Sequence, residues 1–169
     1  MAEAQHFLNV VYGEDVGHMP RENPSVDAAA TPTLYSGRIA RVWNGVAKLG
    51  RTGPGCPLFV VHRGVDHTDV IGAAAISSGL TGSVMGESGL GVCSLIPLRA
   101  GLRIQTTEYD SNLTYVQGDG VCCATATGVW RKATATTEAH VLGYVAAAPA
   151  SVNDLTVLDI RVTNGPAGA

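Results

Sequence analysis

The residue types that bind metals gather in two places, first His62, Asp66, His67 and Asp69, and later Cys122, Cys123 and His140. Zinc sites in proteins use pairs of ligands separated by a few residues. The adjacent cysteines lack the gap that lets both thiolates reach one ion, and the histidine-containing stretch has no second pair of ligands elsewhere. The spacing therefore predicts a polar turn and two small buried thiols, with no metal and no other cofactor.

A serine at position 88 is the nearest approach to a catalytic nucleophile. The stretch Gly86-Glu87-Ser88-Gly89 is similar to the nucleophile turn Gly-x-Ser-x-Gly but does not match it, and no helical pattern follows. The chain also lacks a glycine-rich phosphate-binding motif. We therefore expect a protein that is not an enzyme.

Charge is distributed unevenly along the chain. Residues 1–37 contain five acids and one base, residues 38–65 contain five bases and no acid, and the remainder has nine acids and five bases. One interpretation is that these charges are solvated and that the acidic segment folds over its own basic strands. The other is that the charged patches face a partner of opposite sign. The candidate contact residues are the five bases and three apolar residues near the N-terminus, namely Arg38, Arg41, Lys48, Arg51, Arg63, Phe7, Leu8 and Tyr12.

Two classes of partner are disfavoured by composition. The chain has only two lysines and nine aromatic residues, which argues against nucleic acid, because single-stranded nucleic acid is bound by several exposed aromatic residues interleaved with bases. No apolar run approaches the roughly 18 residues of a membrane helix, so we expect no membrane partner. The N-terminus lacks the features of a secretion signal, so we expect synthesis in a cytoplasm and reduced cysteines.

The elements that position these residues are predicted to be strands. Residues 1–35 have no sustained hydrophobic period and contain Pro20, Pro24 and Pro32, which predicts an extended N-terminal arm. Residues 36–169 are predicted to form a single β-domain. Five glycines within residues 77–91 predict a long irregular loop in that domain.

Turn signals and short apolar runs recur every 8 to 14 residues, and no segment has a helical period. Asn44-Gly45 predicts a tight hairpin. Further strands are predicted at residues 58–62, 70–76, 98–107, 115–117, 121–127, 128–133, 140–147 and 155–162. The fold class is all-β, a compact β-sandwich or β-barrel of short antiparallel strands with an extended N-terminal arm. Trp43 and Trp130 are expected in its core.

The C-terminal half carries a series of strand and turn signals, in the order 102–110 (LRIQTTEYD), 114–120 (TYVQGDG), 128–130 (GVW) and 140–145 (HVLGYV). This series resembles the head decoration, or cement, proteins of tailed bacteriophages. Where that family continues from Gly-Asp into a leucine-rich strand, this chain has Gly-Asp-Gly-Val-Cys-Cys. In the resembling series, Gly118 would permit a positive φ, and Asp119 would accept hydrogen bonds from backbone donors in the turn.

The resemblance implies a structural virion protein that binds the exterior of a phage capsid across capsomer junctions and stabilises the shell. It implies the major capsid protein as partner, a homo-oligomer with a trimer favoured, and a location on the virion after synthesis in the host cytoplasm. Two alternatives remain open. The first is a neck or tail adaptor or another virion β-module, and the second is a ligand-binding β-barrel or an enzyme.

Overall fold

The computed structural model describes residues 8–12, 24–26, 34–51, 58–63, 94–134, 140–152 and 154–163. The described residues form strands and turns with no α-helix, and none of their segments is a helix long and apolar enough to cross a membrane. The strand predicted at 70–76 and the glycine-rich loop predicted at 77–91 lie outside the described residues.

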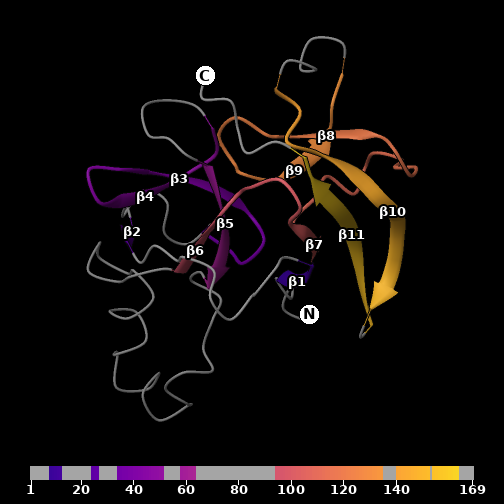
Figure 1. The fold of residues 1–169 in the computed structure, drawn as a ribbon, viewed down its shortest axis with the longest axis horizontal. Coiled ribbons are helices and arrows are strands. Elements are labelled where there is room, and N and C mark those ends of the chain that lie inside the picture. Colours follow the sequence, from indigo (N-terminus) through magenta and orange to yellow (C-terminus); the bar gives the residue numbers. More distant parts are fainter. Residues whose placement is uncertain are drawn as a thin grey trace.

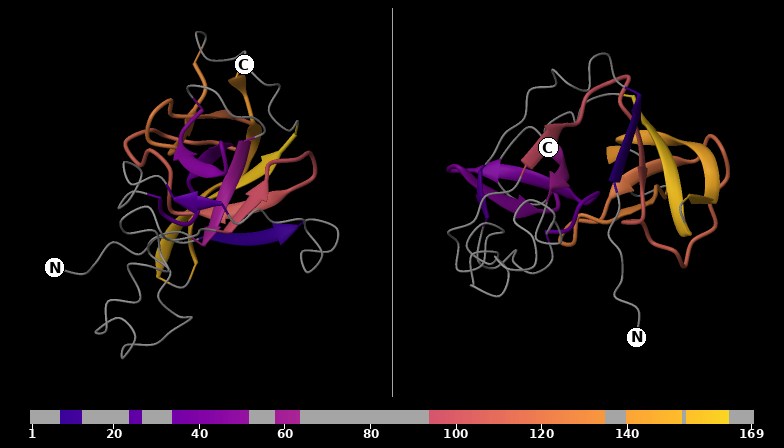
Figure 2. Two further views of the ribbon diagram at one scale, coloured as in Figure 1. Left: turned by 90° about the vertical axis from the view of Figure 1, so that its left-hand side faces the viewer. Right: turned by 90° about the horizontal axis from the view of Figure 1, so that it is seen from below.

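Within the described residues, eleven strands build two sheets (Figures 1 and 2). The strands are β1 (Leu8–Tyr12), β2 (Ser25–Val26), β3 (Ile39–Trp43), β4 (Val46–Leu49), β5 (Leu58–Arg63), β6 (Ser94–Pro97), β7 (Arg103–Thr106), β8 (Gly120–Cys123), β9 (Trp130–Lys132), β10 (Gly143–Val152) and β11 (Leu155–Val162). The six-stranded sheet has the order β1-β7-β11-β10-β8-β9, and the five-stranded sheet has the order β2-β4-β3-β5-β6. All paired strands are antiparallel except β2 and β4. The predicted all-β, sandwich-like fold is confirmed.

The main core lies between the two sheets. Ile39, Leu58, Val60 and Ile96 of the five-stranded sheet pack with residues of the six-stranded sheet in one buried cluster. The six-stranded sheet and its connections contribute Leu102, Ile104, Tyr115, Val121, Cys123, Trp130, Leu142, Val145, Leu158, Ile160 and Val162. This interior is filled with side chains, as expected for a sandwich.

Strand β5 is buried on both faces. Leu58 and Val60 point into the main core, whereas Phe59 and Val61 belong to a second buried cluster with Leu34 on the other face of the five-stranded sheet. A strand covered on both sides needs apolar residues at every position instead of at alternate positions. This requirement explains the continuous apolar run at the start of β5.

The Asn44-Gly45 hairpin is confirmed. Asn44 has a φ of 51° and Gly45 a φ of 75°, and Trp43 pairs with Val46 across the turn. Two positive φ angles define the I′ turn, whose twist matches that of the flanking strands. The hairpin of β3 and β4 extends toward one end of the molecule, and the hairpin of β10 and β11 lies at the other (Figure 1).

One strand prediction in the central part of the sequence is correct only in part, and another is wrong. The strand predicted at residues 98–107 begins only at Arg103, because Leu102 N donates to Arg99 O and Gly101 adopts a φ of 89° in a turn before it. From Leu102 onward the predicted alternation holds, with Ile104 buried and Arg103 outward. Residues 115–117 form no strand, since Tyr115 instead buries its ring against the core.

The Gly118-Asp119 turn has the predicted chemistry. Gly118 adopts a φ of 91°, and Asp119 Oδ2 accepts a hydrogen bond from Val116 N at 2.8 Å. Lys132 Nζ lies 2.7 Å from the same oxygen. These two donors lower the pKa of Asp119 below its ordinary value, with the Lys132 hydrogen bond as the larger cause.

The two sheets are joined along a seam, which we define as the contact of residues 37–51 with residues 108–110 and 124–130. Trp130 Nε1 donates to Gly37 O at 3.0 Å, and Ile39 N donates to Gly128 O at 2.7 Å. Gly128 has a φ of 70°, and a Cβ atom there would collide with Ile39 O. A glycine is therefore required for the backbones to approach this closely.

Candidate interaction surfaces

The described parts of the N-terminal arm belong to both sheets. Strand β1 pairs with β7, and β2 pairs with β4. Leu8, a predicted contact residue, is partly buried against the main core, and Tyr12 stands opposite Arg103 in the register of β1 and β7. Phe7 lies outside the described residues.

Arg38 is held inside the seam. Its Nε lies 2.6 Å from Glu108 Oε2, and its guanidinium stands over the ring of Tyr35 at 4.8 Å. The side chains of Arg38 and Glu108 are 16% and 8% exposed. Arg38 therefore joins segments 70 positions apart in the sequence, and its contact with Glu108 is structural.

The other predicted basic residues lie on the five-stranded sheet or next to it. Arg41 Nη1 donates to Leu49 O at 2.6 Å and to Gly50 O at 3.2 Å, which fixes the side chain across the end of β4. Lys48 pairs with Arg41 in the register of the hairpin and is partly exposed. Arg51 N donates to Thr125 O in the seam, and Arg63 is the last residue of β5. The fold thus brings Arg41 and Lys48 together and places Arg38 and Arg51 in the seam.

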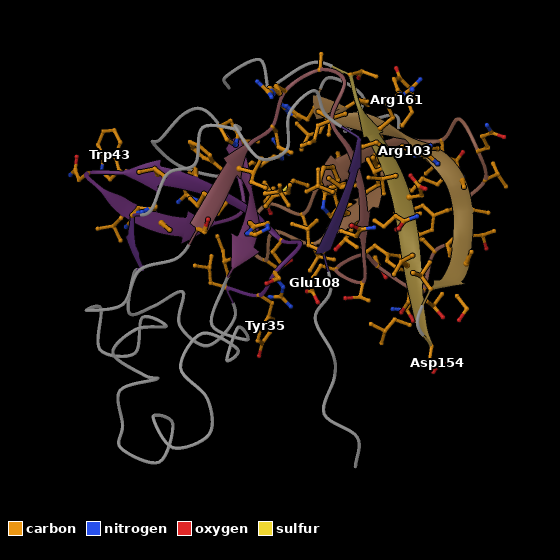
Figure 3. All side chains as sticks on the ribbon, turned by 60° about the horizontal axis from the view of Figure 1, so that its bottom comes forward. Tyr35, Trp43, Arg103, Glu108, Asp154 and Arg161 are labelled. Carbon is orange, nitrogen blue, oxygen red and sulfur yellow. The ribbon has the colours of Figure 1, made fainter. Side chains whose placement is uncertain are left out.

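Trp43 is exposed, so its expected place in the core is wrong. It lies at the end of β3 beside the turn, and 43% of its surface is accessible. Figure 3 shows its ring at the projecting tip of the hairpin, far from the six-stranded sheet. The sequence could have indicated this exposure through the position of Trp43 next to Asn44-Gly45. A tight turn ends the hairpin there, so no further strand residues follow that could cover the ring.

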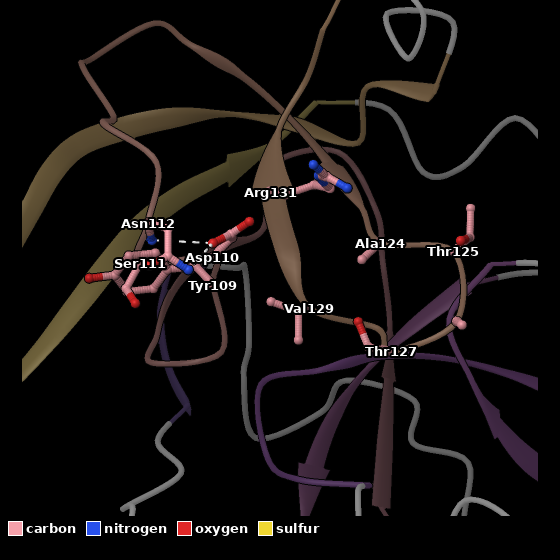
Figure 4. Close-up of a pocket in the computed structure, with 10 residues that line it drawn as sticks. Tyr109, Asp110, Ser111, Asn112, Ala124, Thr125, Thr127, Val129 and Arg131 are labelled. Atoms are coloured by element: carbon pink, nitrogen blue, oxygen red, sulfur yellow. Dashed lines mark hydrogen bonds between the residues drawn. The ribbon is translucent and has the colours of Figure 1, made fainter.

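An open hollow of about 470 Å³ lies between two turns at the β9 edge of the six-stranded sheet (Figure 4). Its walls combine polar and apolar groups in about equal measure, and they are formed by Tyr109, Asp110, Ser111, Asn112, Ala124, Thr125, Ala126 and Thr127, with Val129 and Arg131 of β9 between them. Asp110 Oδ1 accepts hydrogen bonds from both the backbone N and the Nδ2 of Asn112 at 3.2 Å. These hydrogen bonds complete a local turn, as is common for aspartate. They satisfy Oδ1 of Asp110, so no bound ligand is needed to explain the position of that oxygen.

The two adjacent thiols, Cys122 and Cys123, are buried, as predicted, and neither forms a disulfide. Burial raises the pKa of Cys123 to about 12, although the nearby Arg51 and Arg41 act in the opposite direction. A thiol with so high a pKa is protonated at neutral pH and is a poor nucleophile.

Of the residues considered for a metal, His62 lies on β5 and His140 precedes β10, whereas Asp66, His67 and Asp69 lie outside the described residues. Ser88 and its neighbours also lie outside them. Within the part of the chain that the structure describes, no group of three or more histidines, cysteines or acids is placed to hold a metal ion.

No protein-family model, curated protein or solved structure matches the chain.

Proposed function

We propose that this chain is a non-catalytic structural protein of a phage particle, which binds the capsid exterior across capsomer junctions and stabilises the shell. The proposal starts from the resemblance of residues 102–145 to head decoration proteins. The observation that carries it is Trp43, which stands exposed at the tip of a projecting hairpin in the most basic segment of the chain. Tryptophans that fill a pocket on the partner supply much of the binding energy at protein interfaces.

The rest of the molecule suits this role. The seam and the main core join the two sheets through buried contacts, so the hairpin projects from a well-packed body. A pre-organised binding element loses little conformational entropy when it docks. Repeated weak contacts on a symmetric shell then add through multivalency.

The direct test is co-sedimentation of the purified protein with mature shells. We expect the wild type to sediment with shells and Trp43→Ala to lose about tenfold or more in affinity, a typical loss for a buried tryptophan at an interface. Val116→Ala is the matched control, because Val116 is 55% exposed but lies away from the hairpin. Full occupancy by the Trp43 variant, or no sedimentation of the wild type, would contradict the proposal.

The number of copies per particle distinguishes decoration from a neck or tail position. Decoration of a whole shell requires hundreds of copies, whereas a ring at the neck or tail requires roughly six or twelve. Quantitative gel analysis of purified particles measures this number. We propose a trimer as the bound unit, which analytical ultracentrifugation of the free protein would test.

A further inference from the structure

The outward face of the six-stranded sheet carries a row of large side chains from three neighbouring strands. Arg103 of β7 stands opposite Arg161 of β11, and Arg161 stands opposite Tyr144 of β10. Residues directly opposite each other in antiparallel strands project from the same face. The alternate residues, such as Ile104 and Ile160, are buried in the main core, so this row points away from it.

Only one of the two arginines in this row is neutralised. Arg103 donates two hydrogen bonds to the carboxylate of Asp159, each 2.9 Å long, and Gln105 Nε2 donates to the same group at 3.3 Å. Asp159 is 5% exposed, and its contact raises the pKa of Arg103. Arg161 is exposed and has no ion pair among the described residues.

The fold places further exposed groups beside Arg161. Tyr144 is 46% exposed. Arg99 is exposed in the turn before β7, and Gly101 N in that turn donates to Val162 O at 3.0 Å, which brings the turn alongside the end of β11. Figure 3 shows Arg103 and Arg161 near each other on this sheet, well away from Trp43. Sequence reasoning missed this group because its members are brought together only by strand pairing.

Without a partner, this row of side chains lowers the stability of the sheet. Like charges directly opposite each other on neighbouring strands are destabilising, and Asp159 is already committed to Arg103. An exposed tyrosine beside an arginine without a carboxylate partner is, however, the residue combination that is enriched at protein interfaces. Arginine in particular binds carboxylates through two parallel hydrogen bonds.

We propose that Arg161, Tyr144, Arg103 and Arg99, which we call the arginine row, form a docking surface for a carboxylate-bearing segment of another protein. The partner is assigned as a protein and not a nucleic acid, because the chain has a net charge of −3 and so repels an extended polyanion. An acidic polypeptide segment requires only a local positive patch. This surface is separate from the tip of the β3–β4 hairpin, so the inference goes beyond the proposed function.

A short fluorescent peptide with two glutamates among otherwise neutral residues is a suitable probe, with binding followed by anisotropy at low salt and without shells. We expect Arg161→Gln to weaken binding about tenfold and Tyr144→Ala about threefold, since losses of this size are common for central interface residues. Lys48→Gln is the matched control, because it removes one positive charge from the other sheet, and its affinity should stay within about twofold of the wild type. Thermal unfolding of Arg161→Gln should show an unchanged or higher midpoint, because the substitution removes the like-charge contact.

Four outcomes would overturn the proposal. Equal losses in the Arg161 and Lys48 variants would show nonspecific attraction, and unaltered binding by the Arg161 variant, or no binding by the wild type, would exclude the row as the site. Tighter binding of a single-stranded oligonucleotide of the same charge would reassign the partner to nucleic acid. The peptide-binding assay contains no shells. A negative result in it therefore leaves the co-sedimentation test of the proposed function unaffected.

Discussion

The two tryptophans of this chain lie in regions of opposite character. Trp130 is 0% exposed at the seam between the sheets, where its indole nitrogen donates to Gly37 O, whereas Trp43 is 43% exposed at the tip of the β3–β4 hairpin. Both residues belong to short β-strands beside turns. The difference arises from what the rest of the chain packs against them, because Trp130 has a second sheet in front of it and Trp43 extends beyond its partner sheet.

The seam and the tip of the β3–β4 hairpin therefore contribute differently to the molecule. The seam holds the sheets together through close backbone contacts, a buried indole and the Arg38–Glu108 ion pair. The tip contributes little to that packing, since Trp43 is exposed there. Substitutions in the seam should therefore affect stability first, and substitutions at the tip should affect binding first.

The largest effect is expected for Trp130→Ala. Removing a fully buried tryptophan leaves a cavity and should lower the free energy of unfolding by about 3–5 kcal/mol. Urea unfolding followed by circular dichroism measures the loss. Trp130→Phe is the control, since it keeps most of the volume and loses chiefly the hydrogen bond to Gly37 O. A loss below about 1 kcal/mol for Trp130→Ala would mean that the seam is not central to stability.

The next effect tests the close approach of the backbones. Gly128→Ala combines a positive φ with a collision against Ile39 O, and we expect it to cost more than about 2 kcal/mol. Gly45→Ala is the matched control, because its φ of 75° is similar but nothing lies within 4 Å of the added Cβ. It should lower the free energy of unfolding by about 1 kcal/mol. Equal losses measured by urea unfolding would show that φ strain alone matters at both positions.

A smaller effect should appear at alkaline pH. Burial raises the pKa of Cys123 from 9.0 to about 12 and that of Tyr115 from 10.0 to about 12. Both groups stay neutral in the folded protein while the unfolded chain ionises, so these two groups should leave the free energy of unfolding unchanged between pH 7 and about pH 9 and lower it as the pH rises from there toward 12.

The measurement is the urea midpoint between pH 7 and pH 11. Cys123→Ala should flatten the decline that begins near pH 9 while leaving the part due to Tyr115. Gly45→Ala, at the tip, should lower the whole curve without changing its shape. An unchanged decline in the Cys123 variant would show that the thiol does not resist ionisation in the folded state.

The smallest effect on stability is expected for Trp43→Ala, less than about 0.5 kcal/mol, as is typical of exposed positions. Fluorescence provides a second measurement, because the variant retains only Trp130. Its emission should shift to shorter wavelength and resist quenching by acrylamide. A loss of stability comparable to that of Trp130→Ala would show that the tip belongs to the packed core.

Local signals in the sequence predicted local structure well. Asn44-Gly45 specifies its hairpin because both residues tolerate a positive φ, and Gly118-Asp119 specifies its turn through the same preference together with a carboxylate acceptor. Strand β11 was predicted with its observed bounds, because apolar residues recur at short intervals along it from its first residue to its last. The turn at residues 99–102 was missed, since the apolar alternation continues across it and hides the positive φ of Gly101.

Contacts between distant segments could not be predicted in the same way. The pairing of Arg38 with Glu108 spans 70 positions, and the pairing of β1 with β7 turns part of the predicted arm into an edge strand of the six-stranded sheet. The regional charge count correctly identified the basic segment but could not show which of its charges have partners. Arg38 is paired in the seam, whereas Arg161, in a segment with excess acid, is exposed.

The sequence by itself determined the all-β class, the tight turns and the alternation of buried and outward residues from Leu102 onward, because these depend on φ preferences and on neighbours a few positions away. Only the tertiary structure decided which tryptophan is buried, which arginine is neutralised and which arginines share a face. Those outcomes depend on which strands are adjacent and in what register, and a shift of one residue in register would reverse the face of every side chain on a strand.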